Sequence, residues 1–324
     1  MKRFKNILVV CDEGIAVDSA LHRAINVAKR NEASVTLIDV LEAEPGTLRR
    51  LFTALPGVAG DKIEDQILDV HRERLEGLAQ AFKDEGIPIQ TAVEQGTGFV
   101  EVIKRVLSNG HDLVLKGIAE NGTTGPFLSL DMHLMRKCPC PVWVIKSGQS
   151  VETKHILAAV DPDPDDATRD KLNHTIMELA TSLAERDGAK LTVLNVWRVQ
   201  EETVLSHSRL NISREDAQLI IETERRQSGQ RLDLLMADFA DKIGNVDVLH
   251  VKGIAEDVVP QLVSAEGIDT ITMGTVGRTG IPGVFIGNTA ETILNRVRCS
   301  VLTVKPPNFI SPVAAEPIRA KTLS

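Results

Sequence analysis

The sequence predicts an α/β protein made of two consecutive domains, each with an open parallel sheet between layers of helices. Its 324 residues are a typical length for two domains. Short apolar runs alternate with longer amphipathic segments, a pattern typical of parallel sheets that helices cover on both faces. The chain also repeats itself after about 150 to 160 residues, and repetition over a domain length indicates duplication.

Four pairs of segments carry the repeat, and they occur in the same order in both halves. Residues 6–12 match 155–161, residues 33–40 match 189–196, residues 110–117 match 267–274, and residues 137–146 match 298–305. This spacing is too long for a solenoid repeat, so we predict that each half folds as one domain.

Each half is predicted to contain the same series of strands and helices. In the first half, strands are expected near 6–11, 34–40, 88–93, 112–116 and 141–146, and helices near 17–30, 61–85, 98–109 and 129–136. In the second half, strands are expected near 155–160, 190–196, 246–251, 269–273 and 300–305, and helices near 167–187, 213–241, 255–266 and 288–297. Ser213 and Asp216 can form a capping box at the start of the longest of these helices.

Composition limits the functions that the chain can have. Hydrophobic residues make up 43% of it and charged residues 25%, which is typical of a globular protein. The net charge of −8 argues against non-specific binding to nucleic acid or to anionic membranes. The first apolar run, Ile7–Cys11, is too short for a signal peptide or a membrane span. We therefore expect a cytoplasmic protein.

The four cysteines do not show the pattern of a disulfide framework. Cys138 and Cys140 could supply half of a thiolate metal site, but no Cys-x2-Cys motif or histidine cluster accompanies them. The alternative, which the sequence favours, is that they are small buried residues beside a strand. The sequence leaves metal binding by this pair open.

The segment from Ile271 to Glu291 contains the clearest functional pattern. It begins with a short apolar run, continues with glycines at positions 274, 277, 280, 283 and 287, and ends with the features of a helix start. Asn288 and Thr289 can cap such a helix. A strand, a glycine-rich loop and a helix N-terminus in this order present backbone N–H groups to a phosphate. The alternative is a long glycine-rich loop that binds no ligand.

The spacing of Gly274, Gly277 and Gly287 resembles the G-x2-G-x9-G-[S/T] nucleotide loop of the universal stress protein family. It is neither a Walker A loop nor a dinucleotide-binding G-x-G-x-x-G. Asn288 stands where ATP-binding members of the family usually have Ser or Thr, and Thr289 supplies a hydroxyl one position later. Together with the duplication, the segment looks most like the tandem, E-type subgroup of that family.

This resemblance implies a fold, a ligand and a role. Each half is expected to be a Rossmann-like domain of the adenine nucleotide alpha hydrolase type, with an open five-stranded parallel sheet of order 3-2-1-4-5. The implied ligand is ATP, alone or with Mg²⁺, and the implied role is in stress response or regulation. Family members often pair through their last strand, so residues 142–146 and 300–305 are expected to meet within the chain as a pseudo-dimer. The whole chain could also form a homodimer.

Further candidate nucleotide contacts lie at strand ends and inside the loop. Asp161 ends the first strand of the second half, and open parallel sheets bind ligands where the strand order reverses. Its carboxylate could take a ribose hydroxyl or a phosphate-bound metal; alternatively it is a turn former, as the residues at 162–166 are. Val196 ends the second strand, where related proteins hold adenine through the backbone. Arg278 is a weaker candidate for phosphate contact.

The first half departs from the loop pattern. Gly117 matches Gly274, but Glu120 stands where Gly277 would be expected. A carboxylate at this position would bring negative charge towards a phosphate. Asp12 still ends the first strand. We therefore predict one nucleotide site per chain, in the second half, and a first half that has lost ATP binding or binds something else.

We interpret the chain as an ATP-binding regulatory protein with an unknown protein partner. Residues 1–150 are expected to form a domain with a degenerate nucleotide loop, residues 151–310 an ATP-binding domain, and residues 311–324 a flexible tail. The eight histidines and their neighbours show no pattern that indicates a nucleophile paired with a general base, so we assign no catalytic residue. Two alternatives stay open: a slow ATP hydrolase or phosphotransfer enzyme, in which Asp161 helps to hold a metal, and a protein-interaction scaffold that binds no nucleotide.

Overall fold

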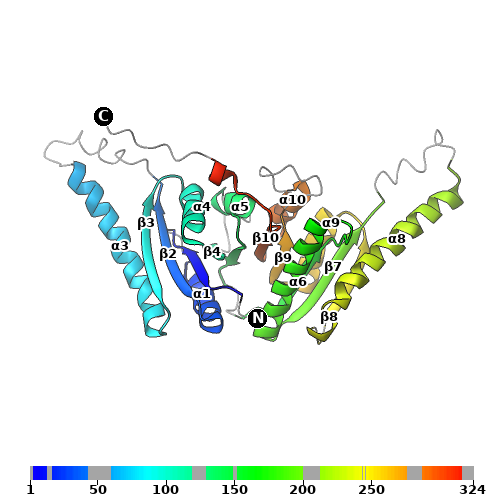
Figure 1. Cartoon of the computed structure of the whole chain (residues 1–324), viewed down its shortest axis with the longest axis horizontal. Helices are drawn as coiled ribbons and strands as arrows, with labels where there is room; N and C mark the ends of the chain where they lie inside the picture. Colours follow the sequence, from blue (N-terminus) through cyan, green and yellow to red (C-terminus); the bar gives the residue numbers. More distant parts are fainter. Residues whose placement is uncertain are drawn as a thin grey trace. The chain divides into compact units, whose positions relative to one another are not determined.

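The computed structural model describes residues 3–12, 17–42, 60–118, 129–148, 152–199, 212–242, 244, 246–275 and 287–315 (Figure 1). The chain divides into two compact units. Of the described residues, the first unit contains those up to residue 148 together with 309–315, and the second contains 152–275 and 287–308. In this part of the chain, no helix is long and apolar enough to cross a membrane.

The first unit is built around a parallel sheet in the order β3-β2-β1-β4-β5. Its strands are β1 (Asn6–Val10), β2 (Ser34–Leu41), β3 (Ile89–Gln95), β4 (Leu113–Ile118) and β5 (Val142–Lys146). In the middle of the sheet, Ile7 of β1 pairs with Val35 of β2 and with Leu113 of β4. The residues of β4 are buried throughout, because helices cover both faces of a doubly wound sheet.

Among the described residues of the first unit, four helices connect these strands: α1 (Val17–Asn31), α3 (Gly60–Asp84), α4 (Gly98–Asn109) and α5 (Ser129–Lys137). The chain moves outward from β1 to β3 and then returns to β4 and β5 on the other side. Right-handed crossovers therefore place α1 and α3 on one face and α4 and α5 on the other. Helices α4 and α5 contact each other, as this arrangement requires.

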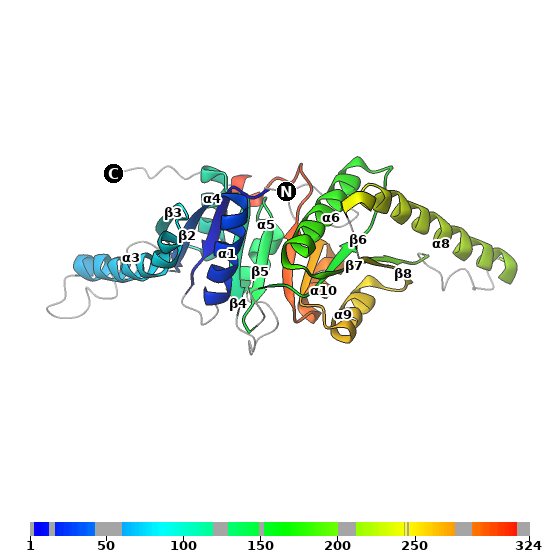
Figure 2. The same cartoon turned by 90° about the horizontal axis from the view of Figure 1, so that it is seen from below.

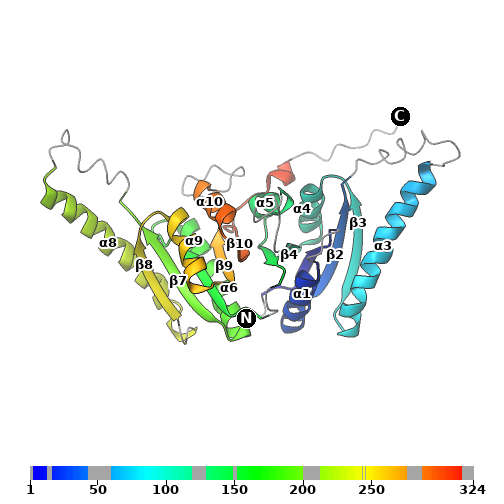
Figure 3. The same cartoon turned by 180° about the vertical axis from the view of Figure 1, so that it is seen from behind.

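The second unit repeats this architecture with the strand order β10-β9-β6-β7-β8. The strands are β6 (His155–Val160), β7 (Lys190–Trp197), β8 (Val246–Lys252), β9 (Thr270–Gly274) and β10 (Ser300–Val304). The helices are α6 (Ala167–Asp187), α8 (Arg214–Ala237), α9 (Ala255–Glu266) and α10 (Asn288–Arg296). Figure 2 shows the strands of this unit between α6 and α8 on one side and α9 on the other. Helices α9 and α10 lie side by side (Figure 3).

The predicted fold class is confirmed in both units, including the strand order 3-2-1-4-5. Local sequence signals at helix ends are also confirmed. The Ser213 hydroxyl accepts a hydrogen bond from the Asp216 backbone N–H (3.0 Å) and donates one to the Asp216 carboxylate (2.7 Å), so the predicted cap begins α8. Gly188 and Gly267 end α6 and α9 with φ of +63° and +62°, a conformation that glycine adopts without strain.

The segment predicted as a tail begins with a short helical turn. Pro312–Ala315 form a short 3-10 helix, η3, that contacts α4 of the first unit. Ser311 and Val313 are buried, and the Ser311 hydroxyl accepts a hydrogen bond from the Val313 backbone N–H. Burial of the apolar Val313 side chain stabilises the packing of this segment. The segment has no periodic hydrophobic pattern, so the sequence did not predict this packing.

Candidate functional site

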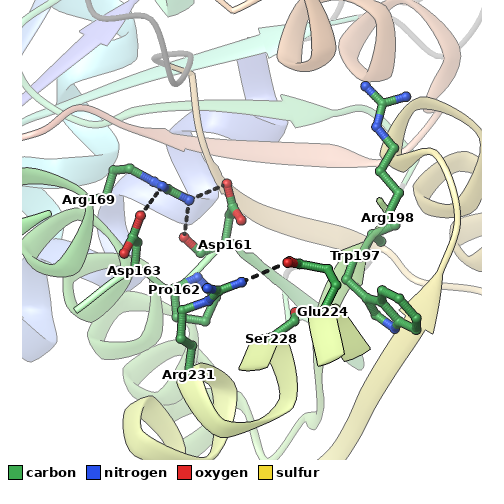
Figure 4. A pocket seen from close by; sticks show the side chains of 10 residues that line it. Asp161, Pro162, Asp163, Arg169, Trp197, Arg198, Glu224, Ser228 and Arg231 are labelled. Carbon is green, nitrogen blue, oxygen red and sulfur yellow. Dashed lines mark hydrogen bonds and ion pairs between the residues drawn. The ribbon is translucent and has the colours of Figure 1, made fainter. Parts of the chain in front are cut away.

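The second unit contains a pocket at the carboxyl ends of β6 and β7 (Figure 4). After β6 the chain passes to β7 and β8 and then returns to β9 on the other side of β6. The strand order therefore reverses beside β6, which is where open parallel sheets bind ligands. The pocket has a volume of about 200 Å³ and is lined by Asp161, Pro162, Asp163, Arg169, Val196, Trp197, Arg198, Glu224, Ser228 and Arg231.

Asp161 follows β6 directly and is fixed by Asn173 of α6. The Asp161 backbone N–H donates to Asn173 Oδ1 (2.8 Å), and Asn173 Nδ2 donates back to the Asp161 carbonyl (2.9 Å). Asn173 is buried, so its amide satisfies main-chain groups that the end of the strand leaves unpaired. This reciprocal pair sets the direction in which the Asp161 side chain leaves the sheet.

The Asp161 carboxylate lies beside an arginine of α6. Arg169 Nη2 is 2.8 Å from Asp161 Oδ2, and Arg169 Nη1 forms a second ion pair with Asp163. Figure 4 shows the guanidinium group between the two carboxylates. The Asp161 side chain keeps 47% of its surface exposed. It therefore stays accessible to a ligand hydroxyl or cation although Arg169 balances part of its charge.

A row of neutral hydrogen-bonding groups lies behind the pocket wall. Asn195 Nδ2 donates to the Val160 carbonyl (3.1 Å), the Ser228 hydroxyl donates to Asn195 Oδ1 (3.0 Å), and His250 Nε2 lies 3.1 Å from the Ser228 oxygen. Burial lowers the pKa of His250, which favours the uncharged ring, and the ring stacks on Trp197 with centroids 5.6 Å apart. Ser228 brings this uncharged row to the pocket surface.

Charged groups of both signs form the rest of the lining. On α8, Arg231 Nη2 lies 3.1 Å from Glu224 Oε1, and both side chains are about one-third exposed. This pair faces the pocket from a different helix than Arg169 does (Figure 4). Carboxylates can accept hydrogen bonds from hydroxyl groups, and guanidinium groups bind phosphate. The lining therefore suits a ligand that carries both hydroxyl groups and negative charge.

The two ends of the glycine-rich loop meet beside the end of β9. The Gly287 N–H donates to the Thr275 carbonyl (2.9 Å), and Thr275 is buried. Lys305, which sequence reasoning did not single out, donates from its buried ammonium group to the Thr275 hydroxyl. A Cβ at Gly274 would lie 2.9 Å from Leu172 Cδ2 of α6. A side chain at position 274 would therefore require the Leu172 side chain to shift.

The start of α10 differs in detail from the sequence expectation. Asn288 and Thr289 do not cap the helix: they are its first two residues, and Gly287 occupies the capping position without a side chain. The Thr289 hydroxyl donates to Glu256 Oε1 of α9 (2.7 Å). The N-terminal amides of α10 therefore lack a side-chain acceptor from Gly287, a situation that favours an anion.

The structure brings part of the predicted site together. Asp161 and Val196 line one pocket, whereas Gly274, Gly287, Asn288 and Thr289 lie at the two ends of the loop. Gly277 and Arg278, like Glu120 in the first half, lie outside the described residues. Contact of all these residues with a nucleotide stays a prediction.

Arg169, Ser228 and Arg231 were not anticipated from the sequence. Each lies on a helix and reaches the pocket across the end of the sheet. The amphipathic pattern of a helix identifies its buried face but not which polar side chain points to a strand end. The spacing of Arg169 from Asp161 carries no motif, so no sequence signal marked it.

The equivalent strand end of the first unit carries a buried ion network. Lys116 Nζ lies 2.8 Å from Asp12 Oδ2 and 3.1 Å from Asp131 Oδ1, and both Lys116 and Asp131 are buried. Burial alone would lower the pKa of Lys116, but the charges of Asp131 and Asp12 outweigh it and raise the pKa. In the internal repeat, the counterpart of Lys116 is Met273. The counterpart of Asp131 is Ala290, because each is the third residue of its helix, α5 or α10. Both counterparts are uncharged.

The paired cysteines lie between α5 and β5, with their sulfur atoms 3.6 Å apart. The hydrogen bond with Cys138 and burial raise the pKa of Cys140 well above its usual value. Metals bind the thiolate form, so this environment does not favour a metal site. Among the residues that the structure describes, no group of three or more His, Cys, Asp and Glu side chains is placed to hold a metal ion.

Comparison with known proteins finds the same family in both halves of the chain. The sequence model of the universal stress protein family matches residues 3–146 and again residues 152–305. The chain is also 29% identical over 320 residues to universal stress protein E of Escherichia coli K12, which covers 97% of this chain and 98% of that protein. The resemblance carried by the glycine spacing and the duplication is thereby confirmed.

Solved structures share the fold over nearly the whole chain. A functionally unknown protein from Pseudomonas aeruginosa PAO1 matches with a TM-score of 0.70 at 21% identity, covering 97% of this chain and 96% of that one. A universal stress protein from Archaeoglobus fulgidus matches with a TM-score of 0.64 at 17% identity, covering 93% and 98%. With one family matched in each half and this fold shared, the chain belongs to the universal stress protein family and contains two consecutive domains of it.

Proposed function

We propose that this protein binds one ATP per chain, in the second unit, and acts as a regulatory protein of the stress response. The observation that carries the proposal is that Asp161 and Val196 line one pocket at the edge of the sheet where the loop from Gly274 to Gly287 begins and ends. A carboxylate, a strand end and a helix N-terminus are the groups needed for ribose, base and phosphate respectively.

The size of the pocket supports a divided site. Its volume of about 200 Å³ is below the roughly 300–1,000 Å³ of pockets that enclose a whole drug-sized ligand. We assign these walls to the nucleoside, with Asp161 at the ribose hydroxyls and the Val196 backbone beside the base. The phosphates would lie towards the N-terminus of α10 and the loop residues 276–286, and any Mg²⁺ would enter bound to them.

Binding, rather than rapid turnover, is the activity that the lining favours. Arg169 is paired with Asp161 and Asp163, and Arg231 with Glu224. These ion pairs hold the cations in position in the ground state, whereas phosphoryl transfer needs charges aimed at the transition state. Neither the hydrolase alternative nor the scaffold alternative gains support from a specific contact in the described lining.

The test is calorimetric titration of the full-length chain with ATP, using matched variants in the two halves. Asp161→Asn removes the negative charge in the second unit, and Asp12→Asn makes the same change at the equivalent position of the first. We expect one site in the wild-type protein, an affinity about tenfold weaker in Asp161→Asn, and wild-type affinity in Asp12→Asn. Two equivalent sites, no binding, or equal losses in both variants would contradict the proposal.

A further inference from the structure

The backbone carbonyl at the end of the first strand accepts its hydrogen bond from a different kind of side chain in each unit. The residue after β1 is Cys11, and its counterpart in the repeat is Val160. In the first unit Asp39 of the second strand faces Cys11, and in the second unit Asn195 faces Val160. Both Asp39 and Asn195 are buried. The exchange of a carboxylate for a carboxamide at one buried position therefore separates the two sites.

In the second unit the Asn195 carboxamide bonds to both neighbouring polar groups by itself. Asn195 Nδ2 donates to the Val160 carbonyl (3.1 Å), while Asn195 Oδ1 accepts from Ser228 of α8 (3.0 Å). An amide carries both donors and an acceptor, so it satisfies the carbonyl and the hydroxyl at the same time. No cation is required beside Asn195.

In the first unit the carboxylate cannot donate to the carbonyl, since an ionised carboxylate only accepts. Arg74 of α3 bridges the two groups instead: its Nη2 donates to the Cys11 carbonyl and to Asp39 Oδ2 (3.0 Å), and its Nη1 to the Asp12 carbonyl (3.4 Å). His71 Nδ1 also lies 2.6 Å from Asp39 Oδ2. A buried carboxylate is costly without such partners, so Asp39 holds the guanidinium over the end of β1.

The counterpart of Arg74 is a residue of the pocket lining. His71 and Ser228 hold equivalent helical positions, because each contacts the polar residue of the second strand. Three residues further along come Arg74 and Arg231. Arg231 pairs with Glu224 on its own helix and lines the pocket. The arginine at this helical position therefore contacts the strand-end carbonyls in the first unit and Glu224 in the second.

We propose that Asp39 and Arg74 fill the nucleotide cleft of the first unit, and that Asn195 keeps the equivalent cleft of the second unit open. The proposal rests on the nucleotide site proposed above. Arg74 contacts the carbonyls of Cys11 and Asp12. The counterpart of Asp12 is Asp161, which lines the pocket of the second unit. Lys116 engages the Asp12 carboxylate as well. In the second unit Arg169 of α6 contacts the equivalent residue, Asp161, at its carboxylate and its carbonyl, so the two units place different cations at the end of their first strand.

The first experiment measures the arginine positions directly and needs no nucleotide. Full-length protein is labelled with phenylglyoxal, which modifies accessible guanidinium groups, and the rates are read by peptide mass spectrometry. In Asp39→Asn we expect Arg74 to react severalfold faster, while exposed Arg72 on the same helix keeps its rate. Buried Arg23 must stay protected, which shows that the variant is folded. An unchanged Arg74 rate in the folded variant would overturn the proposal.

The reverse exchange tests the second unit with the same label. In Asn195→Asp the new carboxylate should draw Arg231 away from Glu224 and over the Val160 carbonyl. We expect Arg231 to react severalfold more slowly, while exposed Arg225 on the same helix keeps its rate. An Arg231 rate equal to that of the wild type would show that this position does not control the arginine.

The second experiment connects the exchange to binding. Asn195→Asp should weaken ATP binding about tenfold, and the double variant Asn195→Asp/Arg231→Gln, which removes the closing cation, should recover most of that loss. A double variant as weak as the single one would overturn the role of Arg231. If the wild-type protein binds no ATP, the proposed function is wrong, but the labelling rates still test whether Asp39 and Arg74 fill the cleft of the first unit. If the protein binds ATP but the labelling rates do not change in the variants, only the role of Asp39 and Arg74 is wrong.

Discussion

The glycines at the two ends of the loop are under different physical constraints. Gly274 is packed so closely against Leu172 that a methyl group would lie 2.9 Å from Leu172 Cδ2. Gly287 has φ −61° and ψ 139°, a conformation that any residue adopts. The backbone therefore does not demand glycine at position 287, and its absence of a side chain matters for what approaches the N-terminus of α10.

Replacement of Gly287 by valine tests this reason. The new side chain would crowd the helix N-terminus where the proposed phosphate lies. We expect ATP affinity to fall about tenfold or more, while far-ultraviolet circular dichroism stays like that of the wild type. Gly77→Val is a suitable control, since a side chain there meets open space in the first unit. Unchanged affinity in Gly287→Val would mean that this end of the loop holds no phosphate.

His174 gives a prediction for pH dependence. Burial lowers the pKa of this histidine, but its hydrogen bonds to Asp238 and to the Asp170 carbonyl outweigh burial and raise the pKa. A raised folded pKa means that the contribution to stability is complete below the unfolded pKa, about 6.5, and is lost as pH rises through the folded value.

We therefore expect wild-type protein and His174→Gln to differ most in their free energy of unfolding near about pH 5.5, and least near about pH 8.5. Urea denaturation at several pH values measures this difference. A difference that stays constant or grows with rising pH would contradict the assignment. Asp238→Asn should show the same trend, because it removes the charge that stabilises the imidazolium form.

At single positions, the sequence was informative where a residue's place followed from the end of a strand. Asp161 and Val196 were predicted as candidates in this way, and both line the pocket. The importance of Asn195 could not be predicted, because its role depends on which groups Ser228 and the Val160 carbonyl present to it. Such pairings join residues far apart in sequence, and no local pattern records them.

Among secondary structure elements, those with a strong apolar pattern were predicted most closely. The strand predicted at 155–160 is β6 (His155–Val160), and the helix predicted at 98–109 is α4 (Gly98–Asn109). The helix predicted at 213–241 ends earlier, at Ala237, with a separate 3-10 turn at Ala240–Lys242. Helix α8 buries only Ser228, Leu232 and Leu235, so its mostly polar surface gave little indication of its end.

The contact between β4 and α5 yields a prediction for stability. Lys116→Met removes the ammonium group between Asp12 and Asp131, and Asp131 is fully buried. Removing one partner of a buried ion pair costs about 3–5 kcal/mol, and we expect a loss of this size in the free energy of unfolding. The double variant Lys116→Met/Asp131→Ala copies Met273 and Ala290 of the second unit and should recover most of it. Urea denaturation measures both; a double variant as unstable as the single one would contradict this explanation.

Over the whole molecule, the duplication has kept one architecture and changed its charges. The first unit carries Lys116 and Asp39 where the second carries Met273 and Asn195. Since both units keep the same strand order, these exchanges alter the site and not the fold. The pairing of residues 142–146 with 300–305, and the protein's cellular location, stay predictions.

We expect ATP turnover by the intact protein to be slower than about one per second, near the low end for ordinary enzymes. The chain has no Walker lysine, and two of the three arginines in the described pocket lining, Arg169 and Arg231, are engaged by carboxylates. Steady-state phosphate release, measured beside ATP binding, checks this expectation. Asp161→Asn controls for a contaminating ATPase: faster turnover that this variant abolishes would favour the hydrolase alternative.

The 3-10 helix η3 has a consequence for synthesis of the protein. It belongs to the first unit and contacts α4, although the residues of the second unit precede it in the chain. At about 5–20 residues per second, a ribosome needs roughly ten to thirty seconds to pass from the end of β5 to η3. The newly made first unit must wait that long for its contact between η3 and α4, so a fragment ending before residue 309 represents the nascent protein and lacks this contact.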